Sequence, residues 1–178
     1  MKTVLVTGGA GFIGLHVVAR FKQDGWRVVV VDRKLGIDIQ NLPALVKMFQ
    51  QEKPMCVIHL AAEVGVRDSL KRPRDYVLTN ILGTYRVLEA AKHAGVERVI
   101  FASSSSVYGT RNGRKGFVET DKINPVSPYA ATKAGGEELC RAWATTYKMP
   151  IIVLRFFTVY GPGNRQDMAC YQFLEKIN

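Results

Sequence analysis

Long apolar runs and cysteine are what this chain has least of. None of its apolar runs reaches the roughly 18 residues that a membrane-spanning helix needs, so the sequence predicts no membrane span. Its three cysteines, Cys56, Cys140 and Cys170, are far apart and odd in number. That pattern argues against a disulfide framework and against a metal site. Reduced thiols of this kind indicate a cytoplasmic protein.

Acidic residues are scarce relative to basic ones, because 15 Asp and Glu stand against 25 Lys and Arg for a formal net charge of +10. Positive charge attracts nucleic acids, but it equally attracts dinucleotides and nucleotide sugars. The densest basic stretches, residues 71–74 and 111–115, are predicted loops, and no nucleic-acid-binding motif accompanies them. We therefore expect no nucleic-acid partner and assign the charge to solvated loops and phosphate-bearing ligands.

Glycine, by contrast, is concentrated near the start of the chain. A predicted strand covers residues 2–7, and Gly8, Gly11 and Gly14 then recur at every third position before an apolar helix. Such a turn brings main-chain N–H groups and a helix N-terminus to one point, which suits a diphosphate. The spacing differs from the G-x-G-x-x-G of many dehydrogenases, and a plain glycine turn could also produce it. Its position between strand and helix favours dinucleotide binding.

An acidic residue ends the next predicted strand. The continuous apolar run at 28–31 is typical of a strand covered on both faces, and Asp32 follows it, 18 residues after Gly14. A carboxylate there can accept hydrogen bonds from the ribose hydroxyls and repels a 2′-phosphate, which favours NAD over NADP. Arg33 and Lys34 follow directly and weaken that preference.

Strands and helices alternate along the whole chain. Further strands are predicted at 55–60, 99–102 and 151–156, with only a very short one fitting near 37–39, and helices at 12–24, 42–51, 73–95 and 128–147. Right-handed crossovers then give one α/β domain over residues 1–178, a Rossmann-type doubly wound parallel sheet of five full strands. Ligands bind at the carboxyl ends of such strands. His59 falls inside a strand and is expected to be a hydrogen-bonded core histidine.

Two side chains suited to proton transfer lie one helical turn apart. Tyr129 and Lys133 share a helix face, and a nearby ammonium lowers a phenol pKa that is otherwise about 10. Such a tyrosine can exchange a proton at neutral pH, although this spacing alone is common on helix surfaces. The serines at 103–106 follow the preceding strand, where a hydroxyl could hold a substrate oxygen. A helix cap is the alternative reading of that run.

These motifs together resemble the extended short-chain dehydrogenase/reductases, in particular the NAD-dependent epimerase/dehydratase family of nucleotide-sugar enzymes. The resemblance rests on residues 7–14, 59–62, 103–109, 129–133 and 154–157. Residues 61–67, 156–162 and 165–169 are most similar to UDP-glucuronate 4-epimerases. It implies 4-epimerisation of UDP-glucuronate or a related UDP-hexose through transient oxidation at C4 by NAD, with Tyr129 as acid/base.

The resemblance also implies roles for individual residues. The catalytic residues it implies are Ser104, Tyr129 and Lys133. The cofactor-binding residues it implies are Gly8, Gly11, Phe12, Ile13, Gly14, Asp32, Arg33, Asp38, Ile39, Leu60, Ala61, Ala62, Asn80, Tyr129, Lys133 and Phe156. The substrate residues it implies are Val66, Ser104, Ser105, Thr158 and Arg165, of which Arg165 is a candidate for a substrate carboxylate and otherwise a surface arginine.

The chain departs from the family pattern in two places. A segment that includes an edge strand is absent between Asp32 and Asp38, so the third strand of the family is short or absent. Set against the family's length, the C-terminal substrate domain, which the resemblance implies holds most of the nucleotide-sugar pocket, is expected to be missing from these 178 residues. The alternative function is therefore a truncated, catalytically silent NAD-binding module or a partner-dependent subunit.

The family resemblance also implies a homodimer. Two helices, here at 73–93 and 128–147, pair with their copies in the family's dimers. The residues that could form an outward apolar stripe are Tyr85, Leu88, Leu139, Trp143 and Tyr147, although each could equally lie against the sheet.

Overall fold

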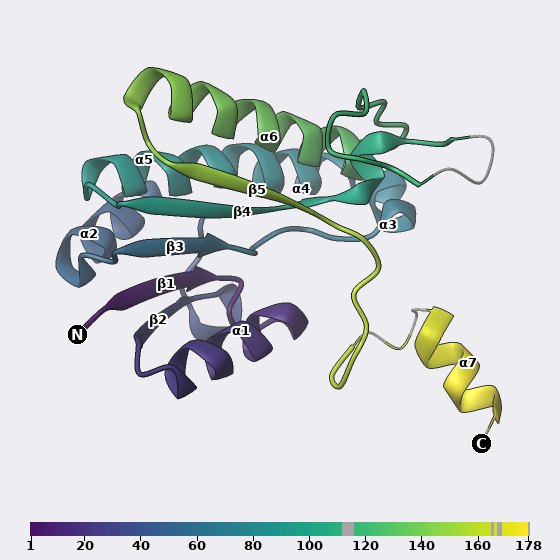
Figure 1. Ribbon diagram of the computed structural model, residues 1–178, viewed down its shortest axis with the longest axis horizontal. Coiled ribbons are helices and arrows are strands. Elements are labelled where there is room, and N and C mark those ends of the chain that lie inside the picture. Colours follow the sequence, from purple (N-terminus) through teal and green to yellow (C-terminus); the bar gives the residue numbers. More distant parts are fainter. Residues whose placement is uncertain (112–115, 165, 167–168, 178) are drawn as a thin grey trace.

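Five parallel strands form one sheet in the order β2-β1-β3-β4-β5 (Figure 1). The computed structural model describes residues 1–178 except 112–115, 165, 167–168 and 178. The strands are β1 (Thr3–Thr7), β2 (Arg27–Val31), β3 (Cys56–His59), β4 (Arg98–Ser104) and β5 (Ile151–Phe156). This arrangement confirms the predicted Rossmann-type sheet, and the described chain has no strand between β2 and β3.

The apolar run of β1 places that strand in the middle of the sheet. Val4, Leu5 and Val6 are fully buried, and Leu5 lies in register with Val29 of β2 on one side and Val57 of β3 on the other. A parallel strand covered on both faces needs such a continuous apolar run rather than an alternating one. Because all the strands are parallel, their carboxyl ends lie at the same edge of the sheet, where the sequence predicts the ligand.

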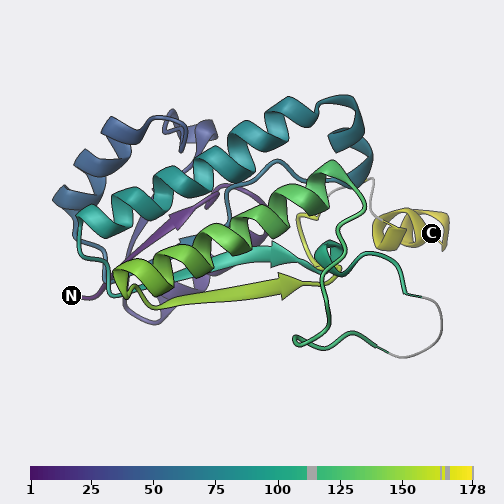
Figure 2. The ribbon, with the colours of Figure 1, turned by 90° about the horizontal axis from the view of Figure 1, so that it is seen from above.

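Helices cover the two faces of the sheet unequally (Figure 2). α1 (Phe12–Gln23) lies on one face, against β1 and β2. The other face carries α2 (Leu42–Glu52), α4 (Pro73–Tyr76), the π-helical segment η2 (Val77–Gly83), α5 (Thr84–His93) and α6 (Pro128–Tyr147). The remaining segments are η1 (Arg33–Leu35), α3 (Val66–Lys71), η3 (Ser105–Tyr108) and α7 (Ala169–Ile177). On the α1 side, Ile152 and Leu154 of β5 stay 46% and 39% exposed.

The predicted long helix at 73–95 is wrong in detail. It is divided into α4, η2 and α5, and the short helix α3 precedes it. A π-helical segment has one extra residue per hydrogen-bonded turn and is frequent at functional sites. Leu88 takes the second of the two places that the sequence leaves open to it, because it is 1% exposed and belongs to the core.

His59 is the hydrogen-bonded core histidine that the sequence predicts. It is 1% exposed, and its Nδ1 and Nε2 lie 2.6 Å from Thr7 Oγ1 and 3.0 Å from Thr84 Oγ1. Burial lowers its pKa from 6.5 to about 3, so the ring is neutral at physiological pH. It ties β1, β3 and α5 together and is not available for proton transfer.

Candidate functional site

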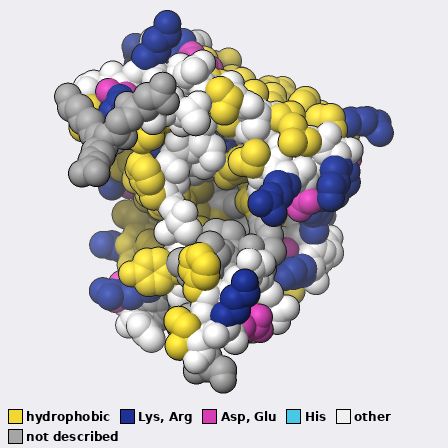
Figure 3. All heavy atoms as spheres, turned by 90° about the vertical axis from the view of Figure 1, so that its right-hand side faces the viewer, with side chains coloured by type: hydrophobic (Ala, Val, Ile, Leu, Met, Phe, Trp, Pro, Cys, Tyr) yellow, Lys and Arg dark blue, Asp and Glu magenta, His cyan; other side chains and the backbone are white. Residues whose placement is uncertain are grey.

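A cleft of about 470 Å³ lies at the carboxyl ends of the strands. Figure 3 looks onto this edge and shows it hollowed, with apolar side chains around the hollow. Every strand contributes to the lining directly or through the residues that follow it, and the first turns of α1 and α6 complete the walls. This is where ligands bind in open parallel α/β sheets.

The glycine turn forms one wall of the cleft. Gly8 has a left-handed backbone with φ of 71°, and its N–H donates to Val31 O at 2.8 Å. A Cβ on Gly14 would overlap Gly8 O and lie 2.6 Å from Gly9 Cα, so only glycine fits there. Gly11 precedes α1 and provides no side-chain cap, and the first turn of α1 contains no acidic residue. The first N–H groups of α1 are therefore left for an anion.

Asp32 connects this turn to the end of β2. Its two carboxylate oxygens accept hydrogen bonds from the backbone N–H of Ala10 and of Lys34, each at 3.0 Å. These bonds fix the carboxylate beside the cleft, where it can accept hydrogen bonds from a ribose. Asp38, held by an Asx turn to the N–H of Gln40, lines the cleft farther along.

Helix α6 brings the proton-transfer pair to the other wall. Ser127 caps the helix, since its hydroxyl accepts from the Ala130 N–H at 3.1 Å, and the helix begins at Pro128 as an N-terminal proline favours. Tyr129 and Lys133 then follow one turn apart, and both line the cleft.

Lys133 is buried at 4% exposure. Its ammonium donates to Ala102 O at 2.8 Å and lies 5.2 Å from the ring centre of Phe101. Burial is the main cause that lowers the pKa of Lys133 from 10.5 to about 8. The positive charge is thus held beside the end of β4, in the same cleft wall as Tyr129.

The depressed pKa of Lys133 makes stability depend on pH in a defined window. Between about pH 8 and 10.5 the unfolded lysine holds a proton that the folded one lacks, so stability rises with pH there. The full rise is on the order of 3 kcal/mol. We expect the free energy of urea unfolding of the wild type, relative to Lys133→Met, to increase from pH 7.5 to 10.5. Parallel curves for the two proteins would contradict the buried lysine.

The serine run serves two purposes. Ser104 lines the cleft, and its hydroxyl also accepts from the Ser106 N–H at 3.2 Å and caps η3. The two readings of this run from sequence are therefore compatible. Ser105 starts η3 and does not contribute to the cleft lining.

A largely buried carboxylate paired with a partly exposed arginine supports the same wall. Glu137 of α6 accepts from the Ser103 hydroxyl at 2.5 Å and from Arg155 of β5 at 2.8 and 3.0 Å. The Arg155 guanidinium also lies 4.7 Å from the ring centre of Tyr108 and donates to Glu119 O. We call these the Glu137 cluster. It joins α6, β4, β5 and the loop before α6 immediately behind the cleft.

Most of the residues predicted from sequence meet in this one cleft. Those that line it are Gly8, Gly11, Phe12, Ile13, Gly14, Asp32, Arg33, Asp38, Ile39, Leu60, Ala61, Ala62, Ser104, Tyr129, Lys133, Phe156 and Thr158. Asn80 and Val66 are not in the lining, and Arg165 lies outside the described residues. The binding and catalytic roles of all of these residues remain predictions.

Asn80 is hydrogen-bonded within the protein, next to the cleft residue Thr79. It is 2% exposed and clamps the backbone of Glu63, accepting from its N–H at 2.8 Å and donating to its carbonyl at 3.0 Å. The same amide donates to Thr132 Oγ1 at 3.0 Å. The side chain positions the loop after β3 against α6 rather than facing the cleft.

Eight further lining residues are not predicted as site residues from the sequence, and Ser103 is predicted only as part of the serine run. The eight are Val31, Ile37, Val64, Thr79, Ala102, Phe157, Val159 and Asn164. Most directly follow or precede a predicted residue, so extending each motif by one position would have found them. In the described residues, no helix is long and apolar enough to cross a membrane, and no trio of His, Cys, Asp or Glu side chains is placed to hold a metal.

The fold and the cleft define a Rossmann-type dinucleotide-binding protein with a Tyr/Lys pair and a serine facing its ligand site. Residues 4–178 match the model of the NAD dependent epimerase/dehydratase family. The chain belongs to that family, whose cofactor is NAD.

Two relatives can be aligned with nearly the whole of this chain. It is 38% identical to Protein CapI of Staphylococcus aureus, covering 98% of this chain and 59% of that protein. It is 39% identical to the UDP-glucuronate 4-epimerase of Thermodesulfobacterium geofontis, covering 99% of this chain and 62% of that protein. The chain thus spans about three-fifths of the length of these relatives.

Solved structures of nucleotide-sugar enzymes are also similar to this chain in sequence and fold. The UDP-glucuronic acid 4-epimerase from Bacillus cereus, in complex with UDP-glucuronic acid and NAD, is 38% identical with a TM-score of 0.87. The alignment covers 99% of this chain and 63% of that one. MoeE5 in complex with UDP-glucose and NAD is 43% identical, also with a TM-score of 0.87, and the alignment covers 98% of this chain and 60% of that one.

Proposed function

We propose that this chain carries the NAD-binding and catalytic part of a UDP-sugar 4-epimerase. The observation that supports this most is the convergence of Tyr129, Lys133 and Ser104 on the cleft that the glycine turn and Asp32 also line. A dinucleotide site and a proton-transfer site in one cleft are what reversible oxidation of a sugar hydroxyl requires.

The residues present fit NAD. The uncapped N-terminus of α1 suits the diphosphate, and the Asp32 carboxylate suits a ribose with a free 2′-hydroxyl. Leu60, Ala61 and Ala62 follow β3 and line the cleft with apolar side chains, two of them small. Bound NAD supplies the hydride acceptor for C4 of the sugar.

The remaining chemistry belongs to the chain itself. Tyr129 takes the proton from the O4 hydroxyl as C4 is oxidised and returns it when C4 is reduced. Lys133 stabilises the phenolate with its positive charge, and the Ala102 carbonyl holds that charge in place. Ser104 holds the same sugar oxygen, since it sits at the end of β4 facing the cleft. Thr158, which also lines the cleft, and Val66, Ser105 and Arg165 are proposed to contact the sugar nucleotide.

UDP-glucuronate is the proposed substrate, with a related UDP-hexose second, because named relatives are UDP-glucuronate 4-epimerases. The test is incubation of the chain with NAD and UDP-glucuronate, followed by chromatography for the C4 epimer. Titration calorimetry with NAD runs alongside. NAD binding without conversion would support the alternative of a silent module or partner-dependent subunit. Absence of NAD binding would overturn the proposal.

A cytoplasmic location is part of the proposal, as expected from unpaired thiols.

We also propose a homodimer built through α4, α5 and α6. Helices α5 and α6 carry an aromatic group that runs outward from the core, in which the Trp143 ring packs against the core and lies 5.8 Å from Tyr85 and 5.6 Å from Tyr147. Tyr147 is 48% exposed, so part of this group is available to a second copy. Light scattering in dilute solution should give twice the 19.8 kDa of one chain. A monomer at micromolar concentration would contradict the interface.

A further inference from the structure

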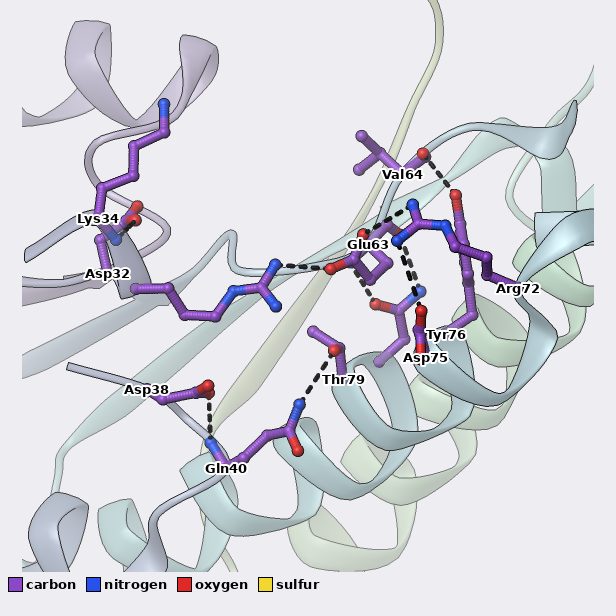
Figure 4. A network of polar contacts seen from close by, with 12 residues as sticks. Asp32, Lys34, Asp38, Gln40, Glu63, Val64, Arg72, Asp75, Tyr76 and Thr79 are labelled. Carbon is purple, nitrogen blue, oxygen red and sulfur yellow. Dashed lines mark hydrogen bonds and ion pairs between the residues drawn. The ribbon is translucent and has the colours of Figure 1, made fainter. Parts of the chain in front are cut away.

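The two cations that follow Asp32 are already engaged by other groups. Sequence alone leaves both free to bind the 2′-phosphate of NADP. In the structure, Lys34 Nζ donates to Ala10 O at 3.3 Å. Arg33 Nη2 lies 2.6 Å from Glu63 Oε1. Figure 4 labels Glu63 among the polar contacts around it, with Asp32 and Lys34 on the other side of the view. The ion pair joins the segment after β2 to the segment after β3, beside the cleft.

Glu63 is the fixed partner of this pair. Its backbone N–H and carbonyl are both bonded to Asn80, which is itself bonded to Thr132 of α6. The Glu63 side chain is 15% exposed, against 56% for Arg33. The Glu63 backbone is therefore held in place and its side chain is largely buried. The more exposed Arg33 side chain extends across to it.

The charges around Arg33 favour that arrangement. Glu63 raises the pKa of Arg33 most, by its hydrogen bond, and Asp38 and Asp32 add smaller electrostatic effects. Arg72 also faces Glu63, but at 3.8 Å, and it is shared with Asp75 at 3.4 Å. A 2′-phosphate placed beside Asp32 would meet these carboxylates with no uncommitted guanidinium from Arg33.

We propose that Glu63 sets cofactor selectivity by holding the Arg33 guanidinium away from the ribose 2′ position beside Asp32. This inference rests on the proposed NAD site. An arginine next to that aspartate accommodates a 2′-phosphate when it is free to do so, and its fork of N–H groups bonds phosphate strongly. With Glu63 in place, Arg33 is bound to a carboxylate instead, and the chain favours NAD.

The test is a pair of calorimetric titrations, with NAD and with NADP, on the wild type and on Glu63→Gln. Loss of the carboxylate releases Arg33, so the Kd for NADP should fall about three- to fivefold, the upper part of what one exposed ion pair is worth. The Kd for NAD should change by less than about twofold. Glu63→Ala should repeat the gain, and thermal unfolding of each variant verifies the fold.

A double-mutant cycle identifies Arg33 as the residue released. In the Arg33→Ala background, Glu63→Gln should give no gain in NADP affinity. Arg72→Ala is the matched control, because it removes an arginine from Glu63 but leaves the Arg33 pair, and it should change neither Kd by more than about twofold.

The outcomes separate this inference from the proposed function. If the wild type binds NAD but Glu63→Gln and Glu63→Ala gain nothing toward NADP, only the inference is overturned. An equal gain with and without Arg33 overturns it as well, because Glu63 would then act only by repulsion. If the wild type binds no NAD, the proposed function fails and the inference fails with it.

Discussion

Replacing Tyr129 with phenylalanine is expected to lower the rate of UDP-glucuronate epimerisation by about a thousandfold, within the range typical of a positioned acid or base. The change removes one oxygen and keeps the ring that meets Tyr76 edge to face at 6.2 Å. The wall of the cleft should therefore keep its shape, while the O4 proton loses its acceptor. NAD affinity should stay within about threefold of wild type.

The measurement is the initial rate of C4 epimer formation, with NAD affinity from calorimetry on the same preparations. Tyr147→Phe is the matched control: it makes the same change on the same helix, at the last residue of α6, and should leave the rate unchanged. If Tyr129→Phe loses NAD binding and turnover equally, the tyrosine is structural and the proposed acid/base role is wrong.

Gly14→Ala is expected to destabilise the fold by about 3 kcal/mol or more, as severe overpacking does. The added Cβ would overlap Gly8 O and lie 2.6 Å from Gly9 Cα. Both neighbours are backbone atoms, which cannot move aside as a flexible side chain can. The helix would have to shift away from the turn that forms the cleft.

Urea unfolding followed by the fluorescence of Trp26 and Trp143 measures this loss. Gly116→Ala is the control, because no atom of the described residues lies within 4 Å of a Cβ at that position, and it should be neutral. Gly11→Ala should differ from both: among the described residues its Cβ would approach only Gly8 O, at 3.2 Å, so the fold should persist while NAD binding weakens. Equal stability of Gly14→Ala and Gly116→Ala would refute the packing argument.

The parts of the fold that follow from local pattern are predicted well. Continuous apolar runs identify the strands, and β5 at 151–156 and α6 at 128–147 match their predicted bounds. A serine cap followed by proline determines where α6 begins, and this places Tyr129 and Lys133. Glycine spacing and Asp32 likewise identify the cleft, since they depend on short stretches of sequence.

Interactions between distant segments are not predicted. The Glu137 cluster joins residues that look, one at a time, like ordinary charges on a helix and at a strand end. The hydrogen bonds that the Asn80 amide makes to Glu63 and Thr132 join three segments that are distant in the sequence, and the resemblance alone does not predict them. The π-helical segment η2 also has no local sequence signal. Each of these depends on which elements pack together, and periodicity within one element does not contain that information.

The Glu137 cluster has a consequence for the order in which the chain can fold during synthesis. Glu137 is only 9% exposed, and its charge is paired by Arg155, 18 residues farther along. A buried charge that lacks its partner costs about 3–5 kcal/mol. On the ribosome, α6 emerges before β5, so docking of α6 against β4 carries this cost until residue 155 has left the exit tunnel. We therefore expect the wall that holds Tyr129 and Lys133 to be completed late in synthesis, after the glycine turn and Asp32 have emerged.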